Sequence, residues 1–179
     1  MIRDVYNTLV RVARHGIKIK DGTKEHAKWT ITKYANEEDW KLGKIMDVSN
    51  FEPNQLMNVG INNLTTILCS AGGTKYDNTN AKIGVGDSST AEVASQTNLQ
   101  AATNKLFKAM DSGFPTYGTS QKAIWQSTFT GTEANWAWNE FCVTNGADGV
   151  GTLLNRKVSS QGTKTAGQVW VVSIEITWS

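Results

Sequence analysis

Gln168 to Ser179 reads QVWVVSIEITWS, and this stretch decides the fold class. Its alternate residues form two sets of different character. The first set is large and apolar and consists of Trp170, Val172, Ile174, Ile176 and Trp178. The second set carries a single charge and consists of Val169, Val171, Ser173, Glu175 and Thr177. A strict period of two over this length predicts a strand with one buried face. Each large buried side chain contributes about 1.5–3 kcal/mol to folding, so this strand should supply much of the core.

Shorter segments with strand character extend through most of the chain. Turn-rich stretches separate them, such as the long turn region 111–121 and the polar loop 87–96. The predicted strands are 28–34, 44–48, 81–85, 103–110, 122–130, 136–144 and 152–159. Regularly spaced short strands joined by turns predict a mainly β fold, namely an antiparallel β-sandwich or a jelly-roll-like barrel.

Helical patterns are confined to three segments. Residues 1–14 place apolar side chains near helical spacing and predict an amphipathic helix. Asn36 precedes three acids and predicts the cap of a short helix. Residues 61–70 predict one interior helix. We therefore expect a basic, helical N-terminal arm over 1–26 and a single β-sandwich domain over 27–179.

Composition and charge limit the possible functions. The chain has 179 residues, of which 39% are hydrophobic and 19% are charged, enough for one core. Its net charge is +2, so the protein as a whole does not suit a polyanionic partner. Residues 1–24 hold six cations and two acids, an excess of +4, which leaves −2 for the rest. Because these cations are few and no aromatic residues alternate with them, we do not expect nucleic-acid binding.

The two cysteines and the apolar segments bear on the cellular compartment. Cys69 and Cys142 lie far apart in the sequence and are interpreted as buried thiols, with a disulfide left open. No segment has the apolar length of a membrane span, so no membrane partner is expected. Residues 1–14 lack the apolar region of a signal peptide, and we expect synthesis in the cytoplasm.

Catalytic and cofactor motifs are weak. His15 and His26, the two histidines, both fall in the arm without a metal-ligand spacing. The segment 83–90 reads IGVGDSST, and its two glycines could suggest a phosphate loop. It lacks the third glycine of a dinucleotide site and the Gly-Lys-Ser/Thr of a P-loop, so relief of crowding at a turn or bulge is the favoured interpretation. We expect no cofactor and no bound metal.

An enzymatic role is the least favoured hypothesis. A glycan hydrolase needs two well-placed carboxylates, and the candidates are Asp87, Asp111 and Glu140. We expect a non-enzymatic protein.

Two groups of residues are candidate contacts with other protein subunits. Trp136 and Trp138 would share one face of a strand, where core packing is the favoured interpretation and a carbohydrate platform or a subunit contact is the alternative. The arm contributes cations that could dock on an acidic neighbour or simply be solvated. These cations are Arg3, Arg11, Arg14, Lys18 and Lys20.

Several motifs occur in an order that resembles a known family. They are AKIGVGDSSTA at 81–91, QTNLQAATNKL at 96–106, NWAWNEF at 135–141, LNRK at 154–157, GTKT at 162–165 and QVW at 168–170. Together they resemble small virion-associated proteins encoded in tailed-phage genomes, over roughly residues 28–179. The resemblance implies a structural component of a phage particle, located in the virion, with no known activity.

The expected function combines this resemblance with the arm. We expect a capsid decoration or auxiliary protein that binds the assembled shell and stabilises it. Its partners would be the major capsid protein or other virion proteins, and the protein itself would form a homo-oligomer, with a trimer favoured. The alternative is a tail, baseplate or fibre component that binds a glycan receptor.

Overall fold

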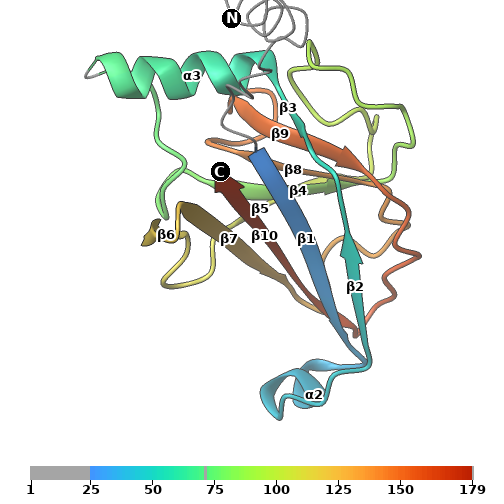
Figure 1. The fold of residues 1–179 in the computed structure, drawn as a ribbon. Coiled ribbons are helices and arrows are strands. Elements are labelled where there is room, and N and C mark those ends of the chain that lie inside the picture. The colour runs from blue at the N-terminus through green and yellow to red at the C-terminus, as the bar shows by residue number, and fades with distance from the viewer. Residues whose placement is uncertain (1–24, 71, 179) are drawn as a thin grey trace, which may run out of the picture.

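The computed structural model describes residues 25–70 and 72–178, which form two β-sheets packed face to face as a β-sandwich (Figure 1). This confirms the predicted fold class. The helix predicted at 1–14 lies outside the described residues. The first strand begins at Glu25, so it includes two residues that the sequence assigned to the arm. His26 belongs to this strand, where its side chain is exposed.

The C-terminal segment, whose alternation predicted the fold class, forms the central strand of the first sheet. Its strands, in spatial order, are β2 (Asp47–Phe51), β1 (Glu25–Tyr34), β10 (Val169–Trp178), β7 (Lys122–Phe129) and β6 (Thr116–Thr119). All neighbours in this sheet are antiparallel. Strand β10 pairs with β1 along its whole length and with β7 from Trp170 to Thr177. The central position gives the backbone of β10 hydrogen-bonding partners on both sides.

The second sheet is also antiparallel and packs against the first. Its strands, in spatial order, are β3 (Gln55–Leu56), β9 (Leu153–Val158), β8 (Glu140–Thr144), β4 (Lys82–Gly86) and β5 (Lys105–Ala109). The chain crosses between the sheets after β2, β5, β7 and β9. Consecutive strands therefore contribute to both layers, and each layer supplies its apolar face to one shared core.

The core follows the predicted alternation along β10. Trp170, Val172, Ile174 and Ile176 are buried between the sheets, and Trp178 is partly buried. The opposite face of the strand is half-buried, except for Val169, which is fully buried although the alternation places it outward. The outer face is therefore covered at the start of this strand.

Two helices lie at opposite ends of the sandwich (Figure 1). Helix α2 (Glu37–Lys41) begins at Asn36, whose side-chain oxygen accepts a hydrogen bond from the Asp39 amide at 2.8 Å, as the capping prediction requires. Helix α3 (Asn58–Cys69) starts three residues earlier than predicted. It can lie close to β9 because Gly60 has no side chain: a Cβ there would be 2.5 Å from the Leu153 carbonyl oxygen.

Three strand predictions need correction. The strand predicted at 44–48 is β2 at Asp47–Phe51, because residues 42–46 form the exit from α2. The turn region 111–121 contains β6, a short exposed edge strand without an apolar pattern. The strand predicted at 136–144 begins only at Glu140, and the residues before it contribute one isolated bridge, between Ala137 and Thr163.

Candidate functional site

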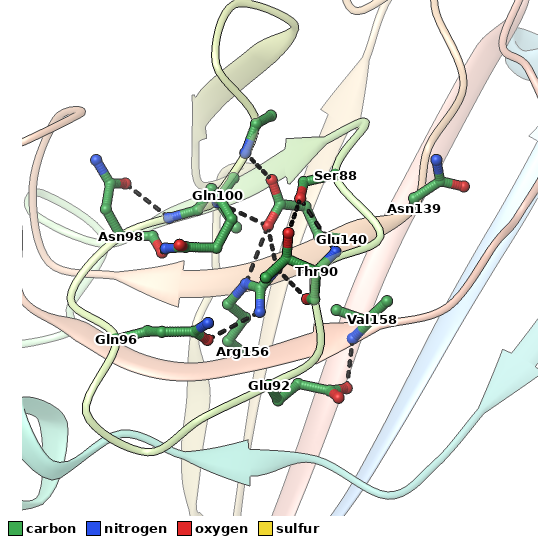
Figure 2. A network of polar contacts seen from close by, with 12 residues as sticks. Ser88, Thr90, Glu92, Gln96, Asn98, Gln100, Asn139, Glu140, Arg156 and Val158 are labelled. Carbon is green, nitrogen blue, oxygen red and sulfur yellow. Dashed lines mark hydrogen bonds and ion pairs between the residues drawn. The ribbon is translucent and has the colours of Figure 1, made fainter.

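A buried ion pair lies under the long loop that joins β4 to β5. Glu140 opens β8, Arg156 lies on the neighbouring strand β9, and both side chains are fully buried. Two guanidinium nitrogens of Arg156 donate to the same carboxylate oxygen of Glu140, Nε at 2.9 Å and Nη2 at 2.6 Å (Figure 2). Burying two charges is costly unless their remaining hydrogen-bonding capacity is also satisfied.

The loop supplies the remaining partners of this ion pair. Arg156 donates to the carbonyl oxygens of Thr90 and Ala91 and to the side-chain oxygen of Gln96 (Figure 2). Glu140 accepts hydrogen bonds from the amides of Gln100 and Ala101, which lie further along the same loop. The ion pair therefore pins both halves of the loop against the outer face of the second sheet.

The two glycines of the IGVG segment make room for this arrangement. A Cβ on Gly86 would be 2.5 Å from the Glu140 Oε1 atom, and one on Gly84 would be 2.6 Å from the Cys142 sulfur. Both glycines lie in β4, directly beside these partners in β8. The predicted relief of crowding is confirmed, but its predicted place at a turn or bulge is wrong, because both glycines lie inside a regularly paired strand. The space beside them is filled by protein side chains.

The covered outer face also holds a small apolar cluster of its own. Met57, Leu99, Cys142 and Leu153 are buried there, separate from the main core. Burial raises the pKa of the Cys142 thiol well above its ordinary value. The prediction of two buried thiols is correct for Cys142 and wrong for Cys69, which is free and exposed near the end of α3. The helix contacts β9 through its Gly60 side and leaves that end uncovered.

Lys164 is a further buried charged residue, and the sequence analysis did not single it out. Its ammonium nitrogen donates to the carbonyl oxygens of Thr130 and Glu133 and to the side-chain oxygen of Asn135, at 2.7–2.9 Å. Burial lowers the pKa of Lys164 to about 8, and the nearby Glu133 carboxylate opposes this shift. These contacts hold the Lys164 side chain against the turn after β7.

The three candidate catalytic carboxylates are not brought into one cleft. Glu140 is sealed beneath the loop on the second sheet. Asp111 lies against Gln126 and Thr128 on the outer face of the first sheet. Asp87 accepts a hydrogen bond from Asn104 beside the start of β5. The paired arrangement that glycoside hydrolysis requires is therefore not formed by these residues.

Trp136 and Trp138 do not form an exposed platform. Trp138 is fully buried, donates its indole N–H to the Ala134 carbonyl at 2.8 Å, and meets the ring of Trp170 edge-on at 4.7 Å. Trp136 is half-buried and packs against the same core. Core packing, the favoured interpretation, is confirmed for Trp138, which is not available to a glycan or a partner. The apolar alternation wrongly placed both residues in a strand, which begins only at Glu140.

The cations of the arm cannot be placed in this way. Arg3, Arg11, Arg14, Lys18 and Lys20 all lie outside the described residues, so their contacts stay a prediction.

The outer face of the first sheet, in contrast, contains an open groove of about 530 Å³. Its walls and floor come from β1, α2, β7, β10 and the turn after β5. The lining residues are Thr32, Tyr34, Trp40, Asp111, Gln126, Thr128 and Val171. Sequence analysis did not single out this group, because five separate elements contribute to it.

A second surface feature is the exit from α2 into the edge strand β2, called the α2–β2 tip below and comprising residues 37–48. Four large apolar side chains there are between 45% and 59% exposed. They are Leu42, Ile45, Met46 and Val48. Exposed apolar residues that cluster in this way mark interaction surfaces more often than scattered ones do.

The comparisons with known proteins add no relative to this description. No family model matches the chain, and neither the curated proteins nor the solved structures give a match. The relationship to phage virion proteins therefore stays an expectation from the motifs. Within the described ranges, no helix is long and apolar enough to cross a membrane, and no group of three or more ligand residues could hold a metal ion.

Proposed function

We propose that this protein is a structural component of a phage particle, an auxiliary protein that binds the assembled capsid shell and stabilises it. The observation that carries the proposal is the α2–β2 tip, where Leu42, Ile45, Met46 and Val48 are exposed together. Burying such side chains against a partner is worth about 25 cal/mol for each Å² removed from water. The motif resemblance to virion-associated proteins supports the same role.

The position of this tip suits a contact between proteins. Strand β2 is an edge strand of the first sheet, and among the described residues one side of its backbone has no strand partner. The tip projects at the end of the sandwich opposite α3, away from the bulk of the domain (Figure 1). A partner could reach it without disturbing the core.

Charge gives the N-terminal arm a role in the same assembly. The tip holds Glu37, Glu38, Asp39 and Asp47 against Lys41 and Lys44, a net charge of −2. The arm is basic and, by its pattern, apolar on one side. Opposite charges guide the encounter of two surfaces and fix their register. Arms exchanged between copies in a symmetric homo-oligomer, with a trimer favoured, would connect neighbouring subunits on the shell.

The hydrogen bonding of the buried charged residues supports a structural role for the domain. The four buried charged residues of the described part, Lys33, Glu140, Arg156 and Lys164, all have partners within the protein. Networks of this kind make a domain rigid when every group is satisfied. A rigid domain loses little conformational entropy on joining a lattice.

Binding to shells that lack this chain tests the proposal. Purified protein is mixed with such shells, and the bound fraction is measured by co-sedimentation. Wild type should bind saturably, and the Ile45→Asp/Met46→Asp double variant should not bind. Val93→Asp is the matched control, since Val93 is 54% exposed on the loop over the other sheet. A wild type that stays in the supernatant, or a double variant that binds like the control, would contradict the proposal.

A further inference from the structure

The groove on the first sheet has a floor of side chains from three paired strands. Thr32 of β1 lies opposite Val171 of β10, and Val171 lies opposite Thr128 of β7. Gln126 lies two residues before Thr128, on the same outward face. Strands hold such a row with fixed spacing, because each is locked to its neighbours by backbone hydrogen bonds.

Asp111 fixes the polar side of this floor. Its carboxylate accepts hydrogen bonds from the Thr128 amide at 3.0 Å, the Thr128 hydroxyl at 2.8 Å and the Gln126 amide nitrogen at 3.1 Å. Its own amide donates to the Gln126 carbonyl at 2.9 Å. With the nitrogen of Gln126 held by Asp111, the side-chain oxygen of Gln126 is left as an acceptor toward the groove. The polar groups are thus positioned before any ligand arrives.

Two aromatic side chains complete the groove. Tyr34 ends β1 and Trp40 lies on α2, and both are partly exposed. Within the described residues, no group hydrogen-bonds to the Tyr34 hydroxyl, the Trp40 indole N–H or the Thr32 hydroxyl. The groove therefore combines aromatic surface with unoccupied donors and acceptors.

We propose that this groove binds carbohydrate, with pyranose rings packed against Trp40 and Tyr34 and their hydroxyls hydrogen-bonded to Asp111, Gln126 and Thr32. The apolar C–H face of a sugar ring is attracted to the negative face of an aromatic ring. Sugar hydroxyls both donate and accept, which suits a floor that offers carboxylate, amide and hydroxyl groups. The volume falls within the range of about 300–1,000 Å³ that is usual for small-ligand sites.

Other classes of ligand fit the groove less well. A phosphate or another anion would meet the Asp111 carboxylate and no cation among the lining residues. A purely apolar ligand would leave the polar floor without hydrogen bonds, which is costly. A neutral, hydroxyl-rich ligand satisfies both the charge and the hydrogen-bonding pattern. This inference does not rest on the proposed shell binding, because Ile45 and Met46 do not line the groove. The two surfaces adjoin, since Trp40 lies within the α2–β2 tip and Val48 of the tip pairs with Thr32 of the groove.

The test begins with an array of printed pyranose oligosaccharides, probed with the full-length protein carrying a fluorescent label. Wild type should bind a defined subset, and the affinity for the best of these is then measured by titration calorimetry. Trp40→Ala and Tyr34→Ala should each weaken this binding about tenfold or more. Tyr117→Ala is the matched control, since Tyr117 is 75% exposed on the edge strand β6, and its affinity should equal that of wild type.

Folding of the variants is separable from binding. Helix α2 contains no buried residue, so Trp40→Ala should keep the wild-type melting temperature within a few degrees. Gln126→Leu provides a second variant, which removes the acceptor but keeps the size of the side chain, and it should also lose affinity. An array without a single bound sugar would overturn the inference, and so would binding that survives Trp40→Ala and Gln126→Leu.

The same variants test whether another copy of the chain, and not a sugar, occupies the groove. If the groove instead receives another copy of the chain, wild type will be oligomeric and Trp40→Ala will shift it toward monomer in light scattering, without any sugar bound. That result overturns the carbohydrate assignment. Retention of sugar binding by Ile45→Asp/Met46→Asp, together with loss of shell binding, would show that the two surfaces act separately.

Discussion

The two outer faces of the sandwich are treated in opposite ways. The outer face of the second sheet is closed by the chain's own loop, which the buried Glu140–Arg156 pair holds in place. Within residues 25–70 and 72–178, the outer face of the first sheet has no such cover over Thr32, Gln126 and Thr128, and a groove remains there. Each sheet has one face in the shared core, so the difference concerns the remaining face alone.

The two faces also differ in what their polar groups bind. On the closed face, charged groups are buried, bonded to protein and unavailable to a ligand. On the open face, Asp111 holds Gln126 and Thr128 in fixed positions while the groove stays accessible. Substitutions on the closed face should therefore change stability strongly, whereas substitutions on the open face should change binding and leave stability nearly unchanged.

The largest effect is expected from Arg156→Met. This change leaves the Glu140 carboxylate buried without its cation, and breaking a buried pair in this way costs about 3–5 kcal/mol. Urea unfolding followed by tryptophan fluorescence measures the loss. Arg156→Met combined with Glu140→Gln should recover part of it, since no unpaired charge is then buried and the one side-chain oxygen at 140 can still accept from one of the two loop amides, of Gln100 or Ala101.

The control for this prediction is the ion pair on the open face. Lys122 and Glu175 are 2.9 Å apart, and their side chains are 36% and 40% exposed. Lys122→Met should cost less than about 1 kcal/mol, because solvent screens the pair. Equal losses for Lys122→Met and Arg156→Met would contradict the distinction between the two faces.

Gly86→Ala should have the next largest effect. The added methyl group would overlap the Glu140 carboxylate and displace it from the loop amides, at a cost of about 1–3 kcal/mol. Thermal unfolding gives the change in stability. Hydrogen exchange should show faster exchange of the Gln100 and Ala101 amides in the variant. Wild-type exchange at these two amides would show that Glu140 does not hold the loop.

The two thiols should differ in reactivity, because one is exposed and the other is buried on the closed face. Cys69 is exposed, whereas Cys142 is buried and its pKa is raised by burial. Native protein should therefore react with a thiol reagent such as DTNB at one site, and denatured protein at two. Cys69→Ser should abolish the native reaction, and Cys142→Ala should leave it unchanged. Reaction of two thiols in the native state would mean that the closed face opens readily.

The smallest effect concerns pH. Burial raises the pKa of Glu92, but the Val158 amide and Lys157 outweigh it, so the net shift is downward from 4.5. A lowered folded-state pKa gives a stabilisation that is present above the unfolded pKa and lost as pH falls through the folded one. Wild type should lose stability more steeply than Glu92→Gln below about pH 4.5. Identical slopes in acid unfolding curves would contradict the role of Glu92 in tying the loop to β9.

The sequence predicted the parts of this fold that depend on local pattern. The alternation in β10 and the capping residue Asn36 were interpreted correctly, because each is a pattern among neighbours in the chain. The glycines before Asp87 relieve crowding as predicted, but against Cys142 and Glu140 of another strand and not at a turn or bulge. Trp136 and Trp138 were misplaced, since their apolar spacing continues that of β8 although the strand begins only at Glu140. The buried partners of Lys164 and Arg156 lie about 16–66 residues away, beyond the reach of any local pattern. The groove joins Tyr34, Asp111 and Val171 through strand order, which spacing does not reveal.

The measurement that tests the central claim most directly is a cryo-electron microscopy reconstruction of shells lacking this chain after incubation with it. The proposed function predicts added density at regular lattice positions, into which the sandwich fits with Leu42, Ile45, Met46 and Val48 against the shell. Shells that remain bare at saturating protein, or density that places the α2–β2 tip away from the shell, would contradict it.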